Sequence, residues 1–372
     1  MEIKKIAIIG ASTGQVKLYE KARALGYYVI GIAWDKGAVC KPLADKFYPI
    51  SIVEKDKVVD VCKKEGVCGV LSNASDLPTL VSSYVAGKLN LNCSPYEVMS
   101  LLTDKSYVRT LSEQIDGLTK IRSYIFDYED PHFLPCIVKP VSNGGKTGLS
   151  YASTIEEFHK AIEYATSNSG GNIIIEEYIS GCEVSVESIS YNGKHYVVQI
   201  TDKENTGAPH FVEISHHQPS ELPEETKQKI GRIIPQLLSR VGFTNGPTHI
   251  ELKVFQNKIY LIEINIRGGG DEISNRLVEL STGYDYVSSM ISVATNTFIP
   301  PYITNRKYAG IYFLTKQTED RLPFFISAKD KPWFVDGEIK TFDLENSLGN
   351  AMKNGFVIYQ STKKVEPISE LL

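Results

Sequence analysis

Apolar strands and amphipathic helices alternate over the first ninety residues of the chain. The predicted strands cover residues 4–9, 28–34 and 69–73, and the predicted helices cover residues 15–25, 55–65 and 77–89. The first strand contains the continuous apolar run Ile6 to Ile9, which is typical of a parallel strand that is buried on both faces. Since strands that alternate with helices build such sheets, residues 1–95 are predicted to form a doubly wound α/β domain.

The pattern changes to an α+β type from residue 137 onward. Short β-rich stretches with hairpin spacing occupy residues 183–200 and 250–266, and helices are predicted over residues 155–165 and 224–241. Pro300 and Pro301 mark a further break. Beyond them, strands are predicted over 308–314 and 356–360, on either side of a proline-bearing stretch over 320–335. This last part, residues 301–372, is expected to be a small C-terminal domain or a layer that completes the preceding one.

Composition narrows the class of protein. A chain of 372 residues corresponds to two or three domains at about 150 residues each. Its 40 lysines and arginines against 44 aspartates and glutamates give a net charge of −4, which argues against a general nucleic-acid binder. The six cysteines form no CxxC pair, the N-terminus lacks a signal-peptide core, and no apolar run approaches about 18 residues. We therefore expect reduced thiols, a cytoplasmic protein and no membrane span.

Two glycine-rich segments follow predicted strands. Gly10 to Gly14 invites a dinucleotide interpretation, but Ser12 and Gln15 stand where that motif needs glycines, so a tight turn is favoured over NAD binding. The second segment, residues 141–148, contains Gly-Lys-Thr without the spacing of a Walker A loop. Its glycines and Lys146 suit either a flexible loop that closes over phosphates or a plain surface hairpin.

The most specific signal is a pair of predicted strands over residues 248–255 and 259–267. Each has an apolar face and a polar face; His249, Glu251 and Lys253 share the polar face of the first strand. On the second strand, Tyr260, Ile262, Ile264 and Ile266 alternate with Glu263, Asn265 and Arg267. The two polar faces coincide only if Glu251 lies opposite Glu263, which implies an odd-length turn around residues 256–258.

This register places two carboxylates side by side, at about 5 Å. Such a pair is destabilising unless a cation lies between the two groups, and oxygen ligands from Glu251, Glu263 and Asn265 suit Mg²⁺. Arg267 extends the same row and could meet a developing phosphate charge. The alternative is a solvated sheet face with ordinary surface acids. His249 is interpreted as an orienting or packing group.

Several motifs now stand in one order: Lys105, Lys139, the 142–148 loop, residues 173–183, and Glu251 followed by Glu263-x-Asn265-x-Arg267. In that order the sequence resembles the ATP-grasp superfamily over roughly residues 1–300, and most of all its amino-acid and peptide ligases. The resemblance implies a doubly wound pre-ATP-grasp domain over 1–95 and an ATP-grasp domain over 96–300. That domain would have a lid subdomain at about 105–178 and a C-terminal subdomain at about 179–300. Ile266 departs from the proline that often precedes the arginine in this family.

The resemblance also implies a nucleotide site. Lys105, Lys139 and Lys146 would contact phosphates, together with the loop residues Ser142, Gly144 and Gly145. Glu176 would accept a hydrogen bond from the exocyclic amine of adenine, and the main chain of Glu177, Tyr178 and Ile179 would meet the ring. Glu183 would accept from the ribose hydroxyls. Taken singly, Lys105, Glu176, Glu177 and Glu183 are each more typical of an ordinary surface charge than of such a site.

The implied reaction is ATP-dependent ligation of a carboxylate to an amine through an acyl phosphate. Glu251, Glu263 and Asn265 would hold Mg²⁺, or Mn²⁺, and Arg267 and Lys146 would act on the transferring phosphoryl group. Arg276 would bind the substrate carboxylate, although a surface arginine on a helix explains it equally well. The expected partners are small carboxylates and amines, without nucleic acid or membrane, and a homodimer is a further expectation.

Three alternatives remain at this point. Bicarbonate or formate could be the phosphorylated acceptor at the same site. A nucleotide-binding scaffold or sensor without turnover has less need of two adjacent carboxylates. NAD-dependent oxidation is the most distant of the three.

Overall fold

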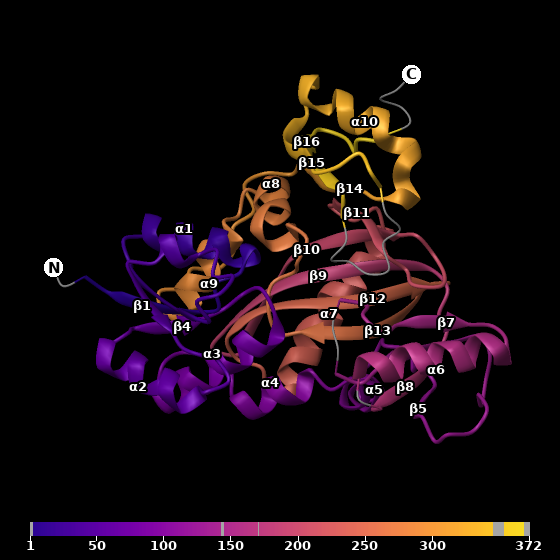
Figure 1. The fold of residues 1–372 in the computed structure, drawn as a ribbon, viewed down its shortest axis with the longest axis horizontal. Coiled ribbons are helices and arrows are strands. Elements are labelled where there is room, and N and C mark those ends of the chain that lie inside the picture. Colours follow the sequence, from indigo (N-terminus) through magenta and orange to yellow (C-terminus); the bar gives the residue numbers. More distant parts are fainter. Residues whose placement is uncertain (1–2, 143–144, 170, 345–352, 368–372) are drawn as a thin grey trace.

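The computed structural model describes residues 3–142, 145–169, 171–344 and 353–367, and Figure 1 shows them arranged around three β-sheets. The mixture of a parallel sheet with two antiparallel sheets confirms the predicted combination of α/β and α+β architecture. Among the described helices, none combines the length and the apolar character needed to cross a membrane.

The N-terminal sheet contains four parallel strands in the order β3-β2-β1-β4. Its strands are β1 (Lys5–Ile9), β2 (Tyr28–Ala33), β3 (Lys46–Pro49) and β4 (Gly69–Leu71), and its helices are α1 (Val16–Ala24), α2 (Lys55–Glu65) and α3 (Asp76–Lys88). Helices α2 and α3 cover one face, as predicted for a doubly wound unit. The other face is covered by α1 and by α9 (Tyr286–Ala294), which lies far beyond the predicted boundary at residue 95. The second face of this sheet is therefore covered by one local helix and by one helix from much later in the chain.

The turn after β1 has the geometry of a filled strand-to-helix connection. Gly10 has a φ of 94°, and the side chain of Gln15 folds back over it to donate to the carbonyl of Ile9 and to the hydroxyl of Ser72. A Cβ on Gly10 would lie 2.6 Å from Gln15 Oε1. Because Gln15 occupies the space above the glycine, the structure favours the tight turn over a dinucleotide loop.

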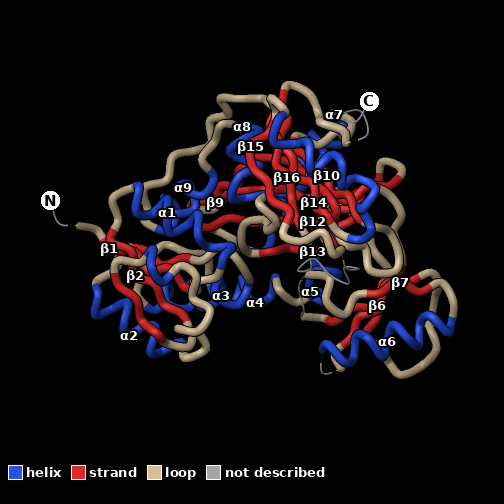
Figure 2. Tube along the Cα trace, turned by 45° about the horizontal axis from the view of Figure 1, so that its top comes forward, coloured by secondary structure: helices blue, strands red, loops and turns tan. Residues whose placement is uncertain are grey.

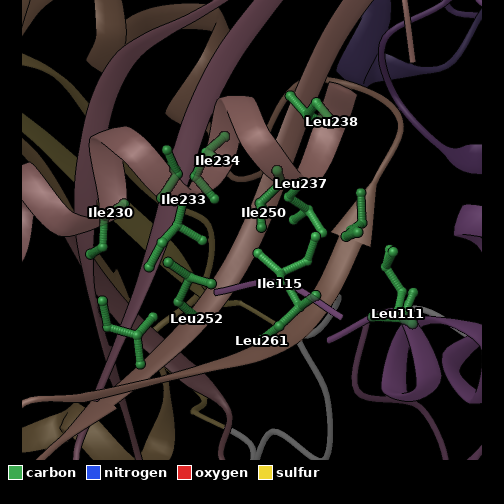
Figure 3. Close-up of a cluster of buried hydrophobic side chains, with 14 of the residues drawn as sticks. Leu111, Ile115, Ile230, Ile233, Ile234, Leu237, Leu238, Ile250, Leu252 and Leu261 are labelled. Atoms are coloured by element: carbon green, nitrogen blue, oxygen red, sulfur yellow. The ribbon is translucent and has the colours of Figure 1, made fainter. Parts of the chain in front are cut away.

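The central sheet has eight antiparallel strands in the order β13-β12-β9-β10-β11-β14-β16-β15. The strands are β9 (Cys182–Tyr191), β10 (Lys194–Asn205), β11 (Glu213–Gln218), β12 (Gly246–Phe255), β13 (Lys258–Asn265), β14 (Tyr308–Leu314), β15 (Phe334–Ile339) and β16 (Gly355–Ser361). Helix α7 (Glu224–Val241) packs its apolar face into one cluster with residues of β9, β10, β12 and β13, and Ile230, Ile234 and Leu237 are fully buried there (Figure 3). This core leaves the opposite face of the same strands for polar side chains.

The C-terminal part of the chain continues this sheet. Strand β14 pairs with β11, and β16 and β15 follow, so residues 308–361 add three strands to the central layer (Figure 1). The predicted proline-bearing stretch contains η4 (Lys316–Arg321), α10 (Leu322–Ser327) and η5 (Ala328–Asp330). Tyr312, Phe324, Trp333 and Tyr359 form an aromatic core beneath it. Of the two predicted arrangements, the structure favours a completing layer.

The third sheet is small and antiparallel, with the order β5-β8-β6-β7. Its strands are β5 (Ser123–Ile125), β6 (Cys136–Pro140), β7 (Ser150–Ala152) and β8 (Ile173–Glu177), and α6 (Ile155–Ser169) covers one face. The remaining elements are η1 (Thr13–Gln15), η2 (Lys41–Leu43), α4 (Tyr96–Leu102), α5 (Lys105–Ser112), η3 (Ile273–Leu277) and α8 (Val278–Thr282). Figure 2 shows this sheet as a separate unit below strand β13, with α5 beside it.

Candidate active site

Two adjoining cavities lie where the small sheet faces the central sheet. The first is open to solvent, encloses about 780 Å³ and is lined by Lys105, Ile121, Ile137, Lys139, Pro140, Lys146, Thr147, Leu149, Glu176, Glu177, Tyr178, Ile179, Glu183, Phe211, Glu251, Lys253, Ile262 and Glu263. The second encloses about 640 Å³ and is lined by Gly145, Lys146, Lys203, Glu213, His249, Glu251, Glu263, Asn265, Arg267, Gly270, Asp271 and Ile273. Lys146, Glu251 and Glu263 line both cavities.

The predicted pairing of the two carboxylates is confirmed, but the turn that was expected to produce it is wrong. Strands β12 and β13 pair Glu251 with Glu263 and His249 with Asn265. The turn has two residues, Gln256 and Asn257, whose φ values of 49° and 62° match a tight hairpin turn. With this even-length turn alone, Glu251 would lie opposite Ile262, and Glu263 would point to the opposite face of the sheet. A β-bulge shifts the pairing by one residue and so brings Glu263 opposite Glu251.

The bulge lies between Glu251 and Leu252 on β12, where Ile262 is the extra residue on β13. Ile262 was predicted to lie on the apolar core face with Ile264, and that prediction is wrong. It lines the first cavity, whereas Ile259, Leu261 and Ile264 enter the core. The bulge thus turns both Ile262 and Glu263 toward the cavity.

Each of the two central carboxylates already has cationic neighbours. Glu251 Oε1 accepts from Lys203 Nζ at 2.7 Å and from His249 Nε2 at 3.3 Å, and Glu263 Oε1 lies 3.2 Å from Lys105 Nζ. Burial alone would raise the pKa of Glu251, but Lys203 and then His249 outweigh it and hold that pKa well below its usual range. The site therefore keeps Glu251 ionised and able to act as a ligand.

The imidazole of His249 lies between two carboxylates. Its Nδ1 lies 2.6 Å from Glu187 Oε1, on the side away from Glu251. Burial alone would lower the pKa of His249, but the charge and hydrogen bonds of Glu187 and Glu251 raise it to about 9. This agrees with the predicted orienting role.

Glu176 is the centre of a buried ion-pair triad. Its Oε1 accepts from Arg109 Nε at 2.7 Å, its Oε2 lies 2.8 Å from Lys139 Nζ, and all three side chains are at most 6% exposed. Burial alone would raise the pKa of Glu176, but Arg109 and Lys139 lower it to about 2. Since both oxygens are engaged, the predicted bond from Glu176 to an exocyclic amine would have to share an oxygen with one of these cations.

Sequence reasoning missed Arg109. It lies one helical turn after Lys105 on α5, on the same buried face, and this spacing was the available signal. Its guanidinium also donates to the main-chain carbonyls of Leu261 and Ile262. Arg109 therefore connects the small sheet to the bulge that orients Glu263.

An apolar slot with aromatic walls lies beside the triad. Tyr178 and Phe211 stack with ring centroids 5.9 Å apart, and the ammonium of Lys253 lies over both rings and donates to Ile179 O at 2.9 Å. The amides of Glu177 and Tyr178 already donate to carbonyls of Arg122 and Pro135. Glu177 also pairs with the guanidinium of Arg122, toward solvent.

Lys146 reaches into a buried cluster of acids from the predicted phosphate loop. With a left-handed φ of 62°, it places Nζ at 3.2 Å from Glu183 and 3.4 Å from Glu213. Lys203, 2% exposed, contacts the same two acids and Glu251. Lys203 and Glu213 were missed because single charged residues in a strand give no signal without their partners.

Arg267 is held at the wall of the second cavity. Its Nη2 donates to Asn265 Oδ1 at 3.3 Å, and its Nε lies 3.5 Å from the carboxylate of Asp76 at the start of α3. Asp76 was not predicted as a site residue. It brings the N-terminal domain to the edge of the site.

Some predicted residues are not brought together with the rest. Arg276 lines a different cavity, beside Thr13, Lys17 and Glu272, and pairs with Asp336 of β15. Ser142 is exposed and is not among the lining residues of either site cavity. Gly144 lies outside the described residues, whereas Gly145 lines the second cavity.

A second group of potential ligand atoms borders the second cavity. Ligand atoms of Glu213, His216 and Asp271 lie within 4.8 Å of one another. His216 is fully buried, and its Nε2 lies 3.2 Å from Glu213 and 3.6 Å from Asp271. This group competes with the Glu251 and Glu263 pair as a place for a divalent ion.

Comparison with known proteins agrees with this geometry. Residues 132–276 match the model of the ATP-grasp domain family. The D-alanine–D-alanine ligase of Fervidobacterium nodosum is 27% identical over 192 residues, which are 48% of this chain and 57% of that ligase. The formate-dependent phosphoribosylglycinamide formyltransferase of Wolinella succinogenes is 23% identical over 71% of this chain and 70% of its own length.

The likeness extends to solved structures. The L-amino acid ligase from Bacillus licheniformis superposes with a TM-score of 0.81 at 21% identity, over 98% of this chain and 94% of that one. The chain spans about half the length of the D-alanine–D-alanine ligases that it matches, from 42% to 57%. Residues 132–276 therefore match the ATP-grasp domain family, and the chain shares its overall fold with the L-amino acid ligase.

Proposed function

We propose that this protein is an ATP-dependent carboxylate–amine ligase. In this reaction the γ-phosphoryl group of ATP passes to a carboxylate, and an amine then displaces phosphate from the acyl phosphate to form an amide. ADP and phosphate are released. The observation that carries the proposal is the junction of the two cavities, where an apolar slot opens into a polar chamber and Glu251, Glu263 and Lys146 line both.

The first cavity has the character of a nucleotide site. The rings of Tyr178 and Phe211, with Ile137 and Ile262, suit a flat apolar base, and Lys105 and Lys139 line the same cavity. A nucleotide whose base lies against Tyr178 and Phe211 would direct its phosphates toward Glu251 and Glu263. The predicted roles of the lysines and of Glu183 are part of the proposal.

The donor set at the junction fits magnesium. Glu251, Glu263 and Asn265 offer only oxygen atoms from adjacent strands, and hard divalent cations prefer oxygen ligands completed by substrate phosphates. We assign Mg²⁺ to these three residues, with Mn²⁺ as a substitute. When bound, the ion would neutralise phosphate charge during transfer.

The protein's own groups would then position and neutralise the reacting atoms. Arg267 lies on the wall of the second cavity, where its guanidinium can face a transferring phosphoryl group or the tetrahedral adduct. Lys146 lies at the junction, within reach of both chambers. Arg276 points into another cavity, so its proposed contact with the substrate carboxylate would require a substrate that extends that far.

A second acceptor class has support from one comparison. The formate-dependent formyltransferase matches 71% of this chain, against 48% for the D-alanine–D-alanine ligase. Formate or bicarbonate would use the same nucleotide and metal groups, and the two proposals differ only in the acid that is phosphorylated.

The test is a screen for phosphate and ADP release with ATP and Mg²⁺ against a panel of carboxylic acids and amines, with product masses read by mass spectrometry. We expect release that requires both an acid and an amine, together with a product lighter than the two substrates by one water. Release that depends on formate or bicarbonate would support the second acceptor class. Tight nucleotide binding without ADP formation across the panel would contradict both and support a scaffold.

A matched pair of variants tests the site. Glu263→Ala should abolish ADP release, because it removes one of the two proposed metal carboxylates. Glu338→Ala, on the edge strand β15, removes an exposed carboxylate outside both cavities and should leave release unchanged. Unchanged turnover in Glu263→Ala would overturn the metal assignment.

A further inference from the structure

Glu187 is a fully buried carboxylate in the second layer of the site. It lies on β9, directly across the ladder from His249 on β12, and its side chain is 0% exposed. A buried carboxylate is costly unless it is paired and hydrogen-bonded. Glu187 is both, and one of its partners, His249, lines the second cavity.

Three donors converge on this carboxylate. Oε1 accepts from His249 Nδ1 at 2.6 Å and from Ser185 Oγ at 3.1 Å, and Oε2 accepts from the amide of Gly269 at 3.2 Å. The other ring nitrogen of His249, Nε2, lies 3.3 Å from Glu251 Oε1. Glu187 is therefore joined to the proposed metal ligand Glu251 through the imidazole of His249. Through the amide of Gly269 it is joined to the glycine loop, residues 268–270, which follows Arg267.

At Gly269 the glycine loop lies so close to His249 and Glu187 that a side chain would not fit. A Cβ on Gly269 would lie 2.7 Å from His249 Nδ1 and 3.1 Å from Glu187 Oε2. Position 269 thus needs glycine because the loop lies against the pair formed by Glu187 and His249. Arg267 and Gly270, on either side of this contact, line the second cavity.

The contacts also determine which oxygen of Glu251 is available. Among the described residues, the donors from His249 and Lys203 both reach Oε1. Glu251 lines both cavities, so Oε2 is the oxygen left for a ligand there. Holding Oε1 from two sides fixes the rotation of the carboxylate.

We propose that Glu187 is a positioning residue for the metal site: through His249 it orients Glu251, and through Gly269 it fixes the loop that carries Arg267. The inference rests on the proposed function, because it takes Glu251 as the metal ligand. Groups that orient metal ligands typically change metal affinity 10- to 100-fold when they are altered. Glu187→Gln keeps the size of the side chain and removes the charge that holds His249.

The experiment is calorimetric titration of ADP into the full-length protein at several Mg²⁺ concentrations, beside a titration with ADP and EDTA. We expect Glu187→Gln to raise the Mg²⁺ concentration needed for half-maximal enhancement of ADP binding by about 10-fold or more. Binding of ADP in EDTA should change less than threefold. A residue that only supports the fold would change both together.

Two further variants keep the test decisive. Glu65→Gln alters another buried carboxylate, which pairs with Lys5 and Lys46 in the N-terminal domain, and should leave the Mg²⁺ requirement unchanged. Ser185→Ala removes one donor to Glu187 and should shift the requirement in the same direction by a smaller factor, even if Glu187→Gln does not fold. A wild-type-like Mg²⁺ requirement in Glu187→Gln, or in Ser185→Ala if only that variant folds, would overturn the inference. Wild-type protein whose ADP binding ignores Mg²⁺ would overturn the proposed function as well.

Discussion

Replacing Arg109 by methionine should cost more stability than any exposed arginine in this chain. The change keeps much of the apolar stem and removes a guanidinium that is 4% exposed. Glu176 would keep Lys139 but lose one of its two cations. The carbonyls of Leu261 and Ile262 would lose their donor at the bulge.

The magnitude follows from these three losses. Breaking a buried ion pair by removing one partner costs about 3–5 kcal/mol, and a buried acceptor left without a donor costs about 1–3 kcal/mol. The terms overlap, and Lys139 retains part of the pairing, so we expect a total of about 4 kcal/mol. Against a typical stability of roughly 5–15 kcal/mol, this is a large fraction.

The assay is urea unfolding at pH 7, followed by far-UV circular dichroism. Arg23→Met is the matched control, because Arg23 is 48% exposed and lies 3.8 Å from Asp45; it should cost less than about 0.5 kcal/mol. Arg109→Lys keeps a charge without the forked donors and should fall between the two. Equal urea midpoints for Arg109→Met and Arg23→Met would refute the reasoning, because the buried contacts of Arg109 would then contribute no more to stability than those of an exposed arginine.

Two other outcomes follow from burial and charge. Because the pKa of Glu176 is lowered to about 2, its stabilising contribution is complete above its ordinary pKa and is lost as pH falls toward 2. Between about pH 6 and pH 3, wild-type protein should therefore lose about 2 kcal/mol more stability than Glu176→Gln, as measured by urea unfolding, and equal losses would contradict this. A thiol reagent such as DTNB should modify the exposed Cys182 first, because burial raises the pKa of Cys62 to about 12 and of Cys136 to about 11; Cys182→Ser should remove the fast phase, and a fast phase that persists would refute the assignment.

The sequence was informative where periodicity alone decides the structure. Strands β1 and β2 are continuous apolar runs because both faces of a parallel strand are buried, and they were predicted on that basis. Strand β3 was missed because its four residues are exposed or only partly buried. Helix α9 was not connected with the N-terminal sheet because no local pattern tells which distant surface a helix will cover.

The carboxylate pair shows the limit of the same reasoning within the site. Alternation predicted that Glu251 faces Glu263, and this is confirmed. The bulge was not predicted, because it leaves no trace in a short strand. The turn was predicted with an odd length, whereas it has two residues, Gln256 and Asn257, which lack the usual Asn-Gly signal. Arg109 and Glu187 were missed for a different reason, because their importance lies in partners more than sixty residues away in sequence.

The most direct measurement is the anomalous signal of Mn²⁺ in crystals grown with a non-hydrolysable ATP analogue. The account predicts one manganese peak coordinated by Glu251, Glu263 and Asn265, with the base between the small sheet and Phe211. A peak held instead by Glu213, His216 and Asp271, with none at the paired carboxylates, would contradict it.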